Sequence, residues 1–188
     1  MLDPSGMNWP DLVTLAQRGN VDAIGALYDQ HHAALFRYLF SRLGERQTAE
    51  DLTGDVFMRM LTALPHYQPS QTPFRAWLYR IARNRLIDHY RKEGPHTPVP
   101  LPQAEEQQDH TEDLGLLADQ KMTTERALAA LSQLEATQRE VVALRFLSGL
   151  SLQEVAETLE KSENAIKALQ HRGLAALRQA LAQDQVLS

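Results

Sequence analysis

The chain contains no cysteine among its 188 residues. It therefore cannot form a disulfide, present a thiolate nucleophile, bind zinc through sulfur or sense redox state through its own thiols. It also lacks an apolar run of the roughly 20 residues needed to cross a membrane, and no signal peptide opens the chain. These absences favour a protein of the cytoplasm with no membrane insertion.

Sequence motifs of catalysis and metal binding are also absent. There is no P-loop, no HExxH and no glycine-rich phosphate cradle. His31 and His32 are adjacent, but neighbours in a helix point about 100° apart, so such a pair rarely shares one ion. The sequence therefore predicts no enzyme, no catalytic residue, no cofactor and no metal site.

The net charge of −5 is distributed unevenly along the chain. Residues 75–92 carry six basic side chains and one acidic side chain. Residues 93–120 carry seven acidic side chains and neither lysine nor arginine. Most of the excess negative charge thus belongs to one short segment, and the basic segment before it keeps a positive local field.

The basic segment Pro73–Lys92 (PFRAWLYRIARNRLIDHYRK) is predicted to be one amphipathic helix, with Thr72 as N-cap and Pro73 in the first turn. Its apolar face collects Phe74, Trp77, Leu78, Ile81 and Ala82. A separate polar stripe holds Arg80, Arg83, Asn84 and Arg91. Guanidinium groups pair with phosphates and aromatic rings stack on unpaired bases, so the pattern is typical of a nucleic-acid strand binder. The alternative is an ordinary solvated basic face.

The rest of residues 11–90 has helical periodicity with little sign of strands. Gly44 is a suitable C-cap, and Thr48 with Asp51 predicts a capping box that starts the next helix, Ala49 to Leu64. Residues 65–72 read as a loop. From 94 onward, prolines and then acidic residues are typical of a linker. We therefore predict an all-α protein with domains at 1–93 and 122–188, joined by a flexible acidic linker at 94–121.

The last third of the sequence predicts a helix-turn-helix. Thr137 with Glu140 and Ser151 with Glu154 have capping-box spacing. A short helix 151–159, a break at Glu160 and a longer helix 162–182 match the motif whose second helix reads the major groove. A capped helical hairpin with no role in DNA binding is the alternative.

These pieces, in this order, resemble the sigma-70 family of bacterial RNA polymerase sigma factors, in its small extracytoplasmic-function (ECF) group. The resemblance extends over Asp11–Leu181. It is carried by Ala49–Leu61, similar to the segment that grips the polymerase clamp, and by Phe74–Lys92, similar to the segment that melts and reads the −10 element. Leu131–Phe146 with Leu150–Arg178 is similar to the module that contacts the flap and reads the −35 element.

The resemblance implies roles for individual residues. For the single-stranded −10 element it implies Arg80, Arg83, Asn84 and Arg91, with Tyr67 in or near a pocket for an extruded base; simple packing is the alternative for Tyr67. For the −35 duplex it implies Ser162, Glu163, Asn164, Lys167, His171 and Arg172. For core polymerase it implies Asp51, Asp55 and Arg59. The sequence departs from the family at Gly54, where glutamine is usual, and at Ala165-Ile166, where Thr-Val is usual.

The implied function is to bind core RNA polymerase at its clamp and flap, direct it to promoters and promote melting. An anti-sigma factor is an expected partner, and the acidic linker would suit the RNA-exit path of polymerase or serve as a plain spacer. One rival is a stand-alone helix-turn-helix regulator, although such a protein has no need of the −10-like helix. Another is a sigma-like protein that no longer initiates transcription.

Overall fold

The computed structural model describes residues 9–93 and 126–186, and every regular element within those residues is helical. The first group consists of α1 (Trp9–Gln17), α2 (Val21–Leu43), α3 (Arg46–Ala63), the 3-10 turn η1 (Leu64–His66) and α4 (Phe74–Glu93). The second consists of α6 (Ala136–Val142), the π-helical turn η2 (Ala143–Leu147), α7 (Leu152–Leu159) and α8 (Glu163–Val186), preceded by a helical segment at 126–132. The predicted all-α class is confirmed, and none of the described helices is long and apolar enough to span a membrane.

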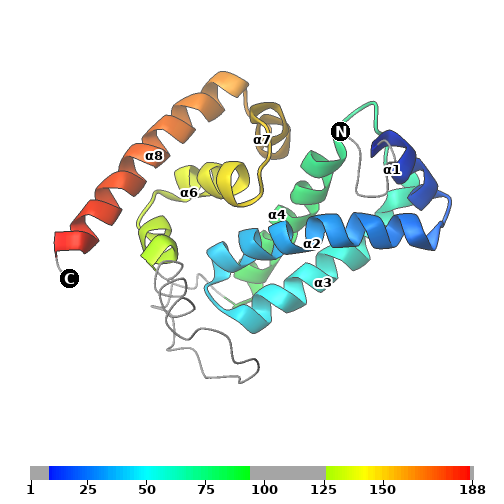
Figure 1. Ribbon diagram of the computed structural model, residues 1–188, viewed down its shortest axis with the longest axis horizontal. Helices are drawn as coiled ribbons and strands as arrows, with labels where there is room; N and C mark the ends of the chain where they lie inside the picture. The colour runs from blue at the N-terminus through cyan, green and yellow to red at the C-terminus, as the bar shows by residue number, and fades with distance from the viewer. Residues whose placement is uncertain (1–8, 94–125, 187–188) are drawn as a thin grey trace, which may run out of the picture.

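In the first group, α2 packs against α1, α3 and α4 (Figure 1). The apolar positions predicted by helical spacing fill the space between these helices. Leu27, Leu35 and Leu39 of α2 are fully buried, as are Val56 of α3 and Leu78 of α4. The apolar face of α4 is thereby fixed, and its polar residues lie away from this core.

Two helix ends in this group compare differently with prediction. Gly44 ends α2 in the left-handed conformation (φ 72°), as predicted, and its amide donates to the Phe40 carbonyl at 2.9 Å. The prediction of a capping box at Thr48 and Asp51 is wrong. Glu45 caps α3 instead, because its carboxylate accepts from the amides of Gln47 at 2.8 Å and Thr48 at 2.6 Å.

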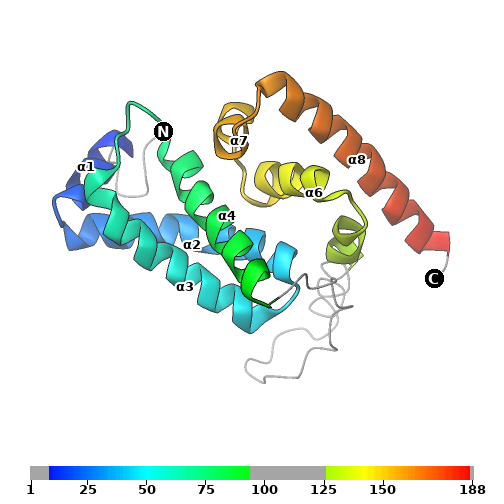
Figure 2. The same ribbon diagram turned by 180° about the vertical axis from the view of Figure 1, so that it is seen from behind.

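In the second group, α6 packs along α8, and α7 lies across the N-terminal end of α8 (Figure 2). Ser151 and Glu154 form the predicted capping box, and Glu160 ends α7 at the predicted break, in the left-handed conformation (φ 54°). The predicted Thr137–Glu140 box is wrong. Glu135 is the N-cap of α6, and Glu140 is buried in a contact with the first group.

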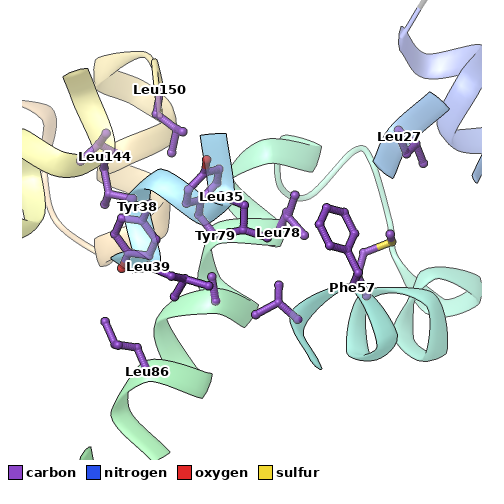
Figure 3. Packing of buried hydrophobic residues seen from close by; sticks show 14 of the residues in the cluster. Leu27, Leu35, Tyr38, Leu39, Phe57, Leu78, Tyr79, Leu86, Leu144 and Leu150 are labelled. Atoms are coloured by element: carbon purple, nitrogen blue, oxygen red, sulfur yellow. The ribbon is translucent and has the colours of Figure 1, made fainter. Parts of the chain in front are cut away.

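The two groups of helices share one apolar core. Leu144 and Leu150 of the second group lie beside Tyr38 and Tyr79 of the first, and all four are almost fully buried (Figure 3). The two tyrosine rings meet edge to face with centroids 5.5 Å apart. The groups are therefore in direct contact. The predicted linker at 94–121 lies outside the described residues, and the domain boundaries remain a prediction.

Glycine positions give a matched stability test. Gly173 of α8 lies against α6, where an added Cβ would come within 2.8 Å of the Val142 Cγ2 atom. Gly54 of α3 has no atom within 4 Å of the same position. Both are helical, so alanine gains about 1 kcal/mol of helix propensity at either site.

We predict that Gly54→Ala raises the free energy of unfolding by about 0.5–1 kcal/mol. Gly173→Ala should lower it, because overpacking costs about 1–3 kcal/mol and exceeds the propensity gain. Urea unfolding followed by circular dichroism would measure both values. Equal stabilisation by the two variants would contradict the close approach of α6 and α8.

Candidate nucleic-acid interface

The polar stripe of α4 is only partly open to solvent. Asn84 and Arg91 are exposed, whereas Arg80 and Arg83 are half-buried. All four lie on the same side of α4, opposite the residues that pack on α2 and α3. The predicted stripe therefore exists, but two of its arginines lie where the second group of helices approaches.

Arg80 is engaged by the C-terminal turn of α7. Its Nε and Nη2 atoms donate to the Glu157 carbonyl at 2.9 and 2.5 Å, and Nη2 lies 3.7 Å from the Glu157 carboxylate. The last carbonyls of a helix lack partners within the helix and carry a partial negative charge. A guanidinium suits that position, so Arg80 caps α7 from the outside.

Arg75, one turn before Arg80, makes a second contact of the same kind. Its Nη2 donates to the Ser148 carbonyl at 2.7 Å, and its Nη1 lies 3.6 Å from the Glu154 carboxylate. The Thr158 hydroxyl, which donates to the Glu154 carbonyl at 2.7 Å, also lies 3.4 Å from the Ala76 carbonyl. The N-terminal half of α4 is thus bound along its length to the segment from η2 to α7.

A third polar contact joins α2 to α6. The Tyr38 hydroxyl donates to Glu140 Oε1 at 2.5 Å, and Arg42 Nη2 lies 3.2 Å from Glu140 Oε2. Tyr38 is fully buried and Glu140 nearly so. Burial raises the pKa of Tyr38 well above its usual value, and the Glu140 charge raises it further. The hydroxyl therefore stays protonated and serves as a donor.

The first turns of α8 present an exposed polar surface. Ser162 caps the helix by accepting from the Ala165 amide at 3.2 Å. The residues predicted for duplex contact are all exposed: Ser162, Glu163, Asn164, Lys167, His171 and Arg172. Ile166 behind them is fully buried against the core. The structure brings this set together on one open surface.

The acidic face of α3 is divided between solvent and α4. Asp51 is exposed and accepts from the Gln47 side chain at 3.1 Å. Asp55 accepts from Arg85 of α4 and lies 3.7 Å from Arg59. Arg85 also donates to Asp88 at 3.2 Å within α4. Asp55 therefore ties α3 to α4 while its outer edge stays accessible beside Arg59.

Tyr67 lies in the packing position that was the alternative to a base pocket. It is 7% exposed, its ring centroid is 4.6 Å from that of Trp77, and its hydroxyl donates to the Thr72 carbonyl at 2.6 Å. Burial raises its pKa to about 12. In this structure its ring has no open face on which a base could stack.

Sequence reasoning missed Arg75, Tyr38, Arg42 and Glu140. The spacing of Tyr38 and Arg42, four residues apart on α2, places a donor and a cation on one face. No local pattern, however, names an acceptor 102 residues away. No cluster of three or more metal-ligating side chains occurs in the described part of the chain.

Two family models match the chain. The model of sigma-70 region 2 matches residues 27–95, which include the α4 stripe and the acidic face of α3. The model of sigma-70 region 4 matches residues 130–179, which include α6, α7 and the exposed turns of α8.

The chain is also similar to individual sigma factors. The ECF RNA polymerase sigma factor BldN of Streptomyces coelicolor is 37% identical over 185 residues, covering 97% of this chain and 69% of BldN. The ECF sigma factor SigX of Bacillus subtilis is 35% identical over 156 residues, covering 81% and 80%. Among solved structures, CnrH in complex with the cytosolic domain of CnrY matches with a TM-score of 0.70 at 28% identity, covering 92% of this chain and 96% of CnrH.

One buried titratable group lies beneath the start of α4. His31 of α2 is 5% exposed, and its ring centroid is 5.5 Å from that of Phe74. Burial, with a smaller contribution from the charge of Arg75, lowers the pKa of His31 from 6.5 to about 4. As the pH falls, the unfolded chain therefore takes up this proton before the folded chain does.

We predict that this histidine contributes stability above about pH 6.5 that is lost as the pH falls toward 4, at up to about 1.4 kcal/mol per pH unit. His31→Gln should flatten the fall in unfolding free energy between pH 6.5 and 4.5 in urea titrations. The matched control is His66→Gln, at an exposed position, which should leave the slope unchanged. An unaltered slope in His31→Gln would refute the assignment.

Proposed function

The chain belongs to the ECF group of RNA polymerase sigma factors, and from this membership we propose how its surfaces divide the work of promoter-specific transcription initiation. Sigma factors are regulatory proteins, and the chemistry of RNA synthesis belongs to core polymerase. Family membership favours this function over that of a stand-alone helix-turn-helix regulator. The proposed site of action is the cytoplasm, because bacterial core polymerase works there.

In this proposal the N-terminal half of α8 recognises the −35 duplex. The supporting observation is that its polar side chains are exposed while Ile166 anchors the helix in the core. Lys167 and Arg172 suit phosphate contacts, and Asn164 has the amide that pairs with adenine in the major groove. Glu163, in the first turn, can accept from a cytosine amino group or favour the helix N-terminus through the helix dipole.

The strand binder in this proposal is α4. Arg80, Arg83, Asn84 and Arg91 line one side of a helix whose other side is locked into the core. Such a row can follow a phosphate backbone, while the packed face keeps the row straight. Because Tyr67 is buried, we base strand binding on these four side chains alone. A pocket for an extruded base at Tyr67 would require the loop that holds this residue to change conformation.

For core polymerase we propose the exposed edge of α3 formed by Asp51, Asp55 and Arg59, with the region 131–147 as a second contact. Met58 is 64% exposed beside this edge and adds an apolar contact. We also propose an anti-sigma partner that covers these surfaces. The solved complex of the sigma factor RpoE with the anti-sigma factor NepR from Bartonella quintana is an example from a protein of similar fold.

The strand-binding role is tested by the double variant Arg80→Ala/Asn84→Ala. We expect it to bind core polymerase as the unmodified chain does, but to fail to form open complexes, because the contacts that hold the separated strand are gone. Promoters would first be selected from a randomised library by run-off transcription. Potassium permanganate footprinting on the selected promoters would then measure melting. Arg46→Ala is the control, because it removes an exposed arginine that belongs to α3 and pairs there with Glu50. Normal melting by the double variant would refute the role of α4.

The polymerase contact is tested at Gly54, where the family usually has glutamine. Gly54 is exposed with open space around it, so glutamine fits without displacing a neighbour. We expect Gly54→Gln to tighten binding to core polymerase by restoring an amide contact, measured by fluorescence anisotropy. Gly25→Gln, at an exposed glycine of α2 with open space around it, is the matched control. Equal affinities for all three chains would show that this edge of α3 does not touch polymerase at position 54.

A further inference from the structure

We propose that Gln17 is a positioning residue for strand binding, because its side chain holds the loop at 67–72 in the form in which Tyr67 covers Trp77. The proposal rests on the proposed role of α4 in binding the −10 strand. Gln17 is the last residue of α1, and it precedes residues 27–95, which the model of sigma-70 region 2 matches. The matched segment therefore assigns no role to Gln17.

The contact is made by one amide group with two acceptors. The Gln17 Nε2 atom donates to the Leu64 carbonyl at 3.0 Å and to the Tyr67 carbonyl at 2.7 Å. A side-chain amide carries two N–H hydrogens, so a single glutamine can hold both carbonyls at once. Leu64 begins η1 and Tyr67 follows it, so the two bonds fix the point at which the chain leaves α3 and enters the loop.

Gln17 presents this amide from a firm support. Leu12 and Ala16 of α1 are almost fully buried. After α1 the chain makes a tight turn at Gly19 (φ 81°) and enters α2 directly, with Asn20 as the N-cap. α1 lies beside η1 and the loop that follows it (Figure 1). The position of Gln17 is thus set by the core of the first group, and the loop is the part that can move.

The loop buries a single aromatic ring. The Tyr67 ring lies against Trp77 with centroids 4.6 Å apart, and its hydroxyl donates to the Thr72 carbonyl at 2.6 Å. The loop residues 68–71 are exposed. Gln17 therefore holds the loop at its start and the tyrosine hydroxyl holds it at its end. In this form Tyr67 occupies the ring face on which an unpaired base would stack.

An unpaired base can stack on Trp77 only when Tyr67 leaves it. The carbonyl that Gln17 holds belongs to Tyr67 itself, so this bond restricts where the ring can go. Gln17 is half-buried, so water can replace it at either carbonyl when the loop opens. The closed loop thus lowers the affinity for every strand that inserts a base, in proportion to the fraction of chains whose loop is open.

The first part of the test measures loop opening in the full chain, by hydrogen exchange followed with NMR. The Tyr67 amide donates to the Leu64 carbonyl at 3.1 Å, so its exchange reports opening at this point. Gln17→Met keeps the length of the side chain and removes its donors. Loss of one neutral hydrogen bond changes an equilibrium about two- to tenfold, so we expect the Tyr67 amide to exchange about tenfold faster. The Gly44 amide, which donates to Phe40 at the end of α2, should keep its rate.

The second part measures strand binding by core polymerase that carries the full chain. Short fluorescent single strands from the selected promoters would carry an abasic site at each position of the −10 element in turn. The position at which loss of the base weakens binding most identifies the inserted base. Gln17→Met should raise the ratio of affinities, intact strand over abasic strand, about tenfold, because only the intact strand requires the open loop.

Two further variants make the test specific. Tyr67→Phe keeps the ring and removes the bond to Thr72, so it should raise the same ratio about threefold. Gln179→Met makes the same substitution as Gln17→Met at an exposed position of α8, in the other group of helices. It should leave both the ratio and the exchange rate unchanged. Circular dichroism melting checks that each variant is folded.

The outcomes separate this proposal from the one it rests on. An unchanged exchange rate of the Tyr67 amide in Gln17→Met overturns the proposal, since Gln17 then does not hold the loop. Faster exchange with an unchanged affinity ratio also overturns it, because Gln17 then only supports the fold. If no abasic position weakens binding to any of the chains, insertion of a base fails as part of strand binding, and the proposed function is what must be revised.

Discussion

An arginine side chain stays charged at every pH at which a protein folds, so a partly buried guanidinium requires an acceptor. Helix α4 carries five arginines in twenty residues, and this requirement shapes much of the molecule. Arg85 takes its acceptors from α3 and from its own helix, whereas Arg75 and Arg80 take theirs from the segment between η2 and α7. Through these contacts α4 connects the first group of helices, to which it belongs, with the second.

Features set by neighbouring residues could be predicted from the sequence. The left-handed ends at Gly44 and Glu160 and the capping box at Ser151 depend on contacts within a few residues. The inward and outward faces of α8 follow from helical spacing, so its exposed set was predicted correctly. The N-caps of α3 and α6 differ from the prediction. The side chain that reaches the free amides is a glutamate just before each helix, whereas the capping-box pattern requires a serine or threonine. Both kinds of cap satisfy the same amides, and local spacing cannot choose between them.

The state of the candidate site could not be predicted in the same way. The four polar residues of the α4 stripe lie on one side of the helix, as predicted. How far they are exposed, however, depends on residues more than 70 positions later in the chain. Tyr67 is similar: the sequence left packing and an open ring as alternatives, and contacts with Phe74 and Trp77 decide for packing. Periodicity describes one helix against an average environment, whereas these outcomes depend on which partner helix is present.

The chemistry of the contact between the groups suits a reversible arrangement better than a permanent one. A contact made only of leucines would gain free energy steadily with buried area and would be hard to open. Here Glu140 and Arg42 are buried as a pair, and the cost of removing such charges from water offsets most of their attraction. The pair contributes little net stability, yet it strongly disfavours any arrangement that leaves one charge unmatched. A contact of this kind therefore selects one arrangement of the two groups while adding little to its net stability.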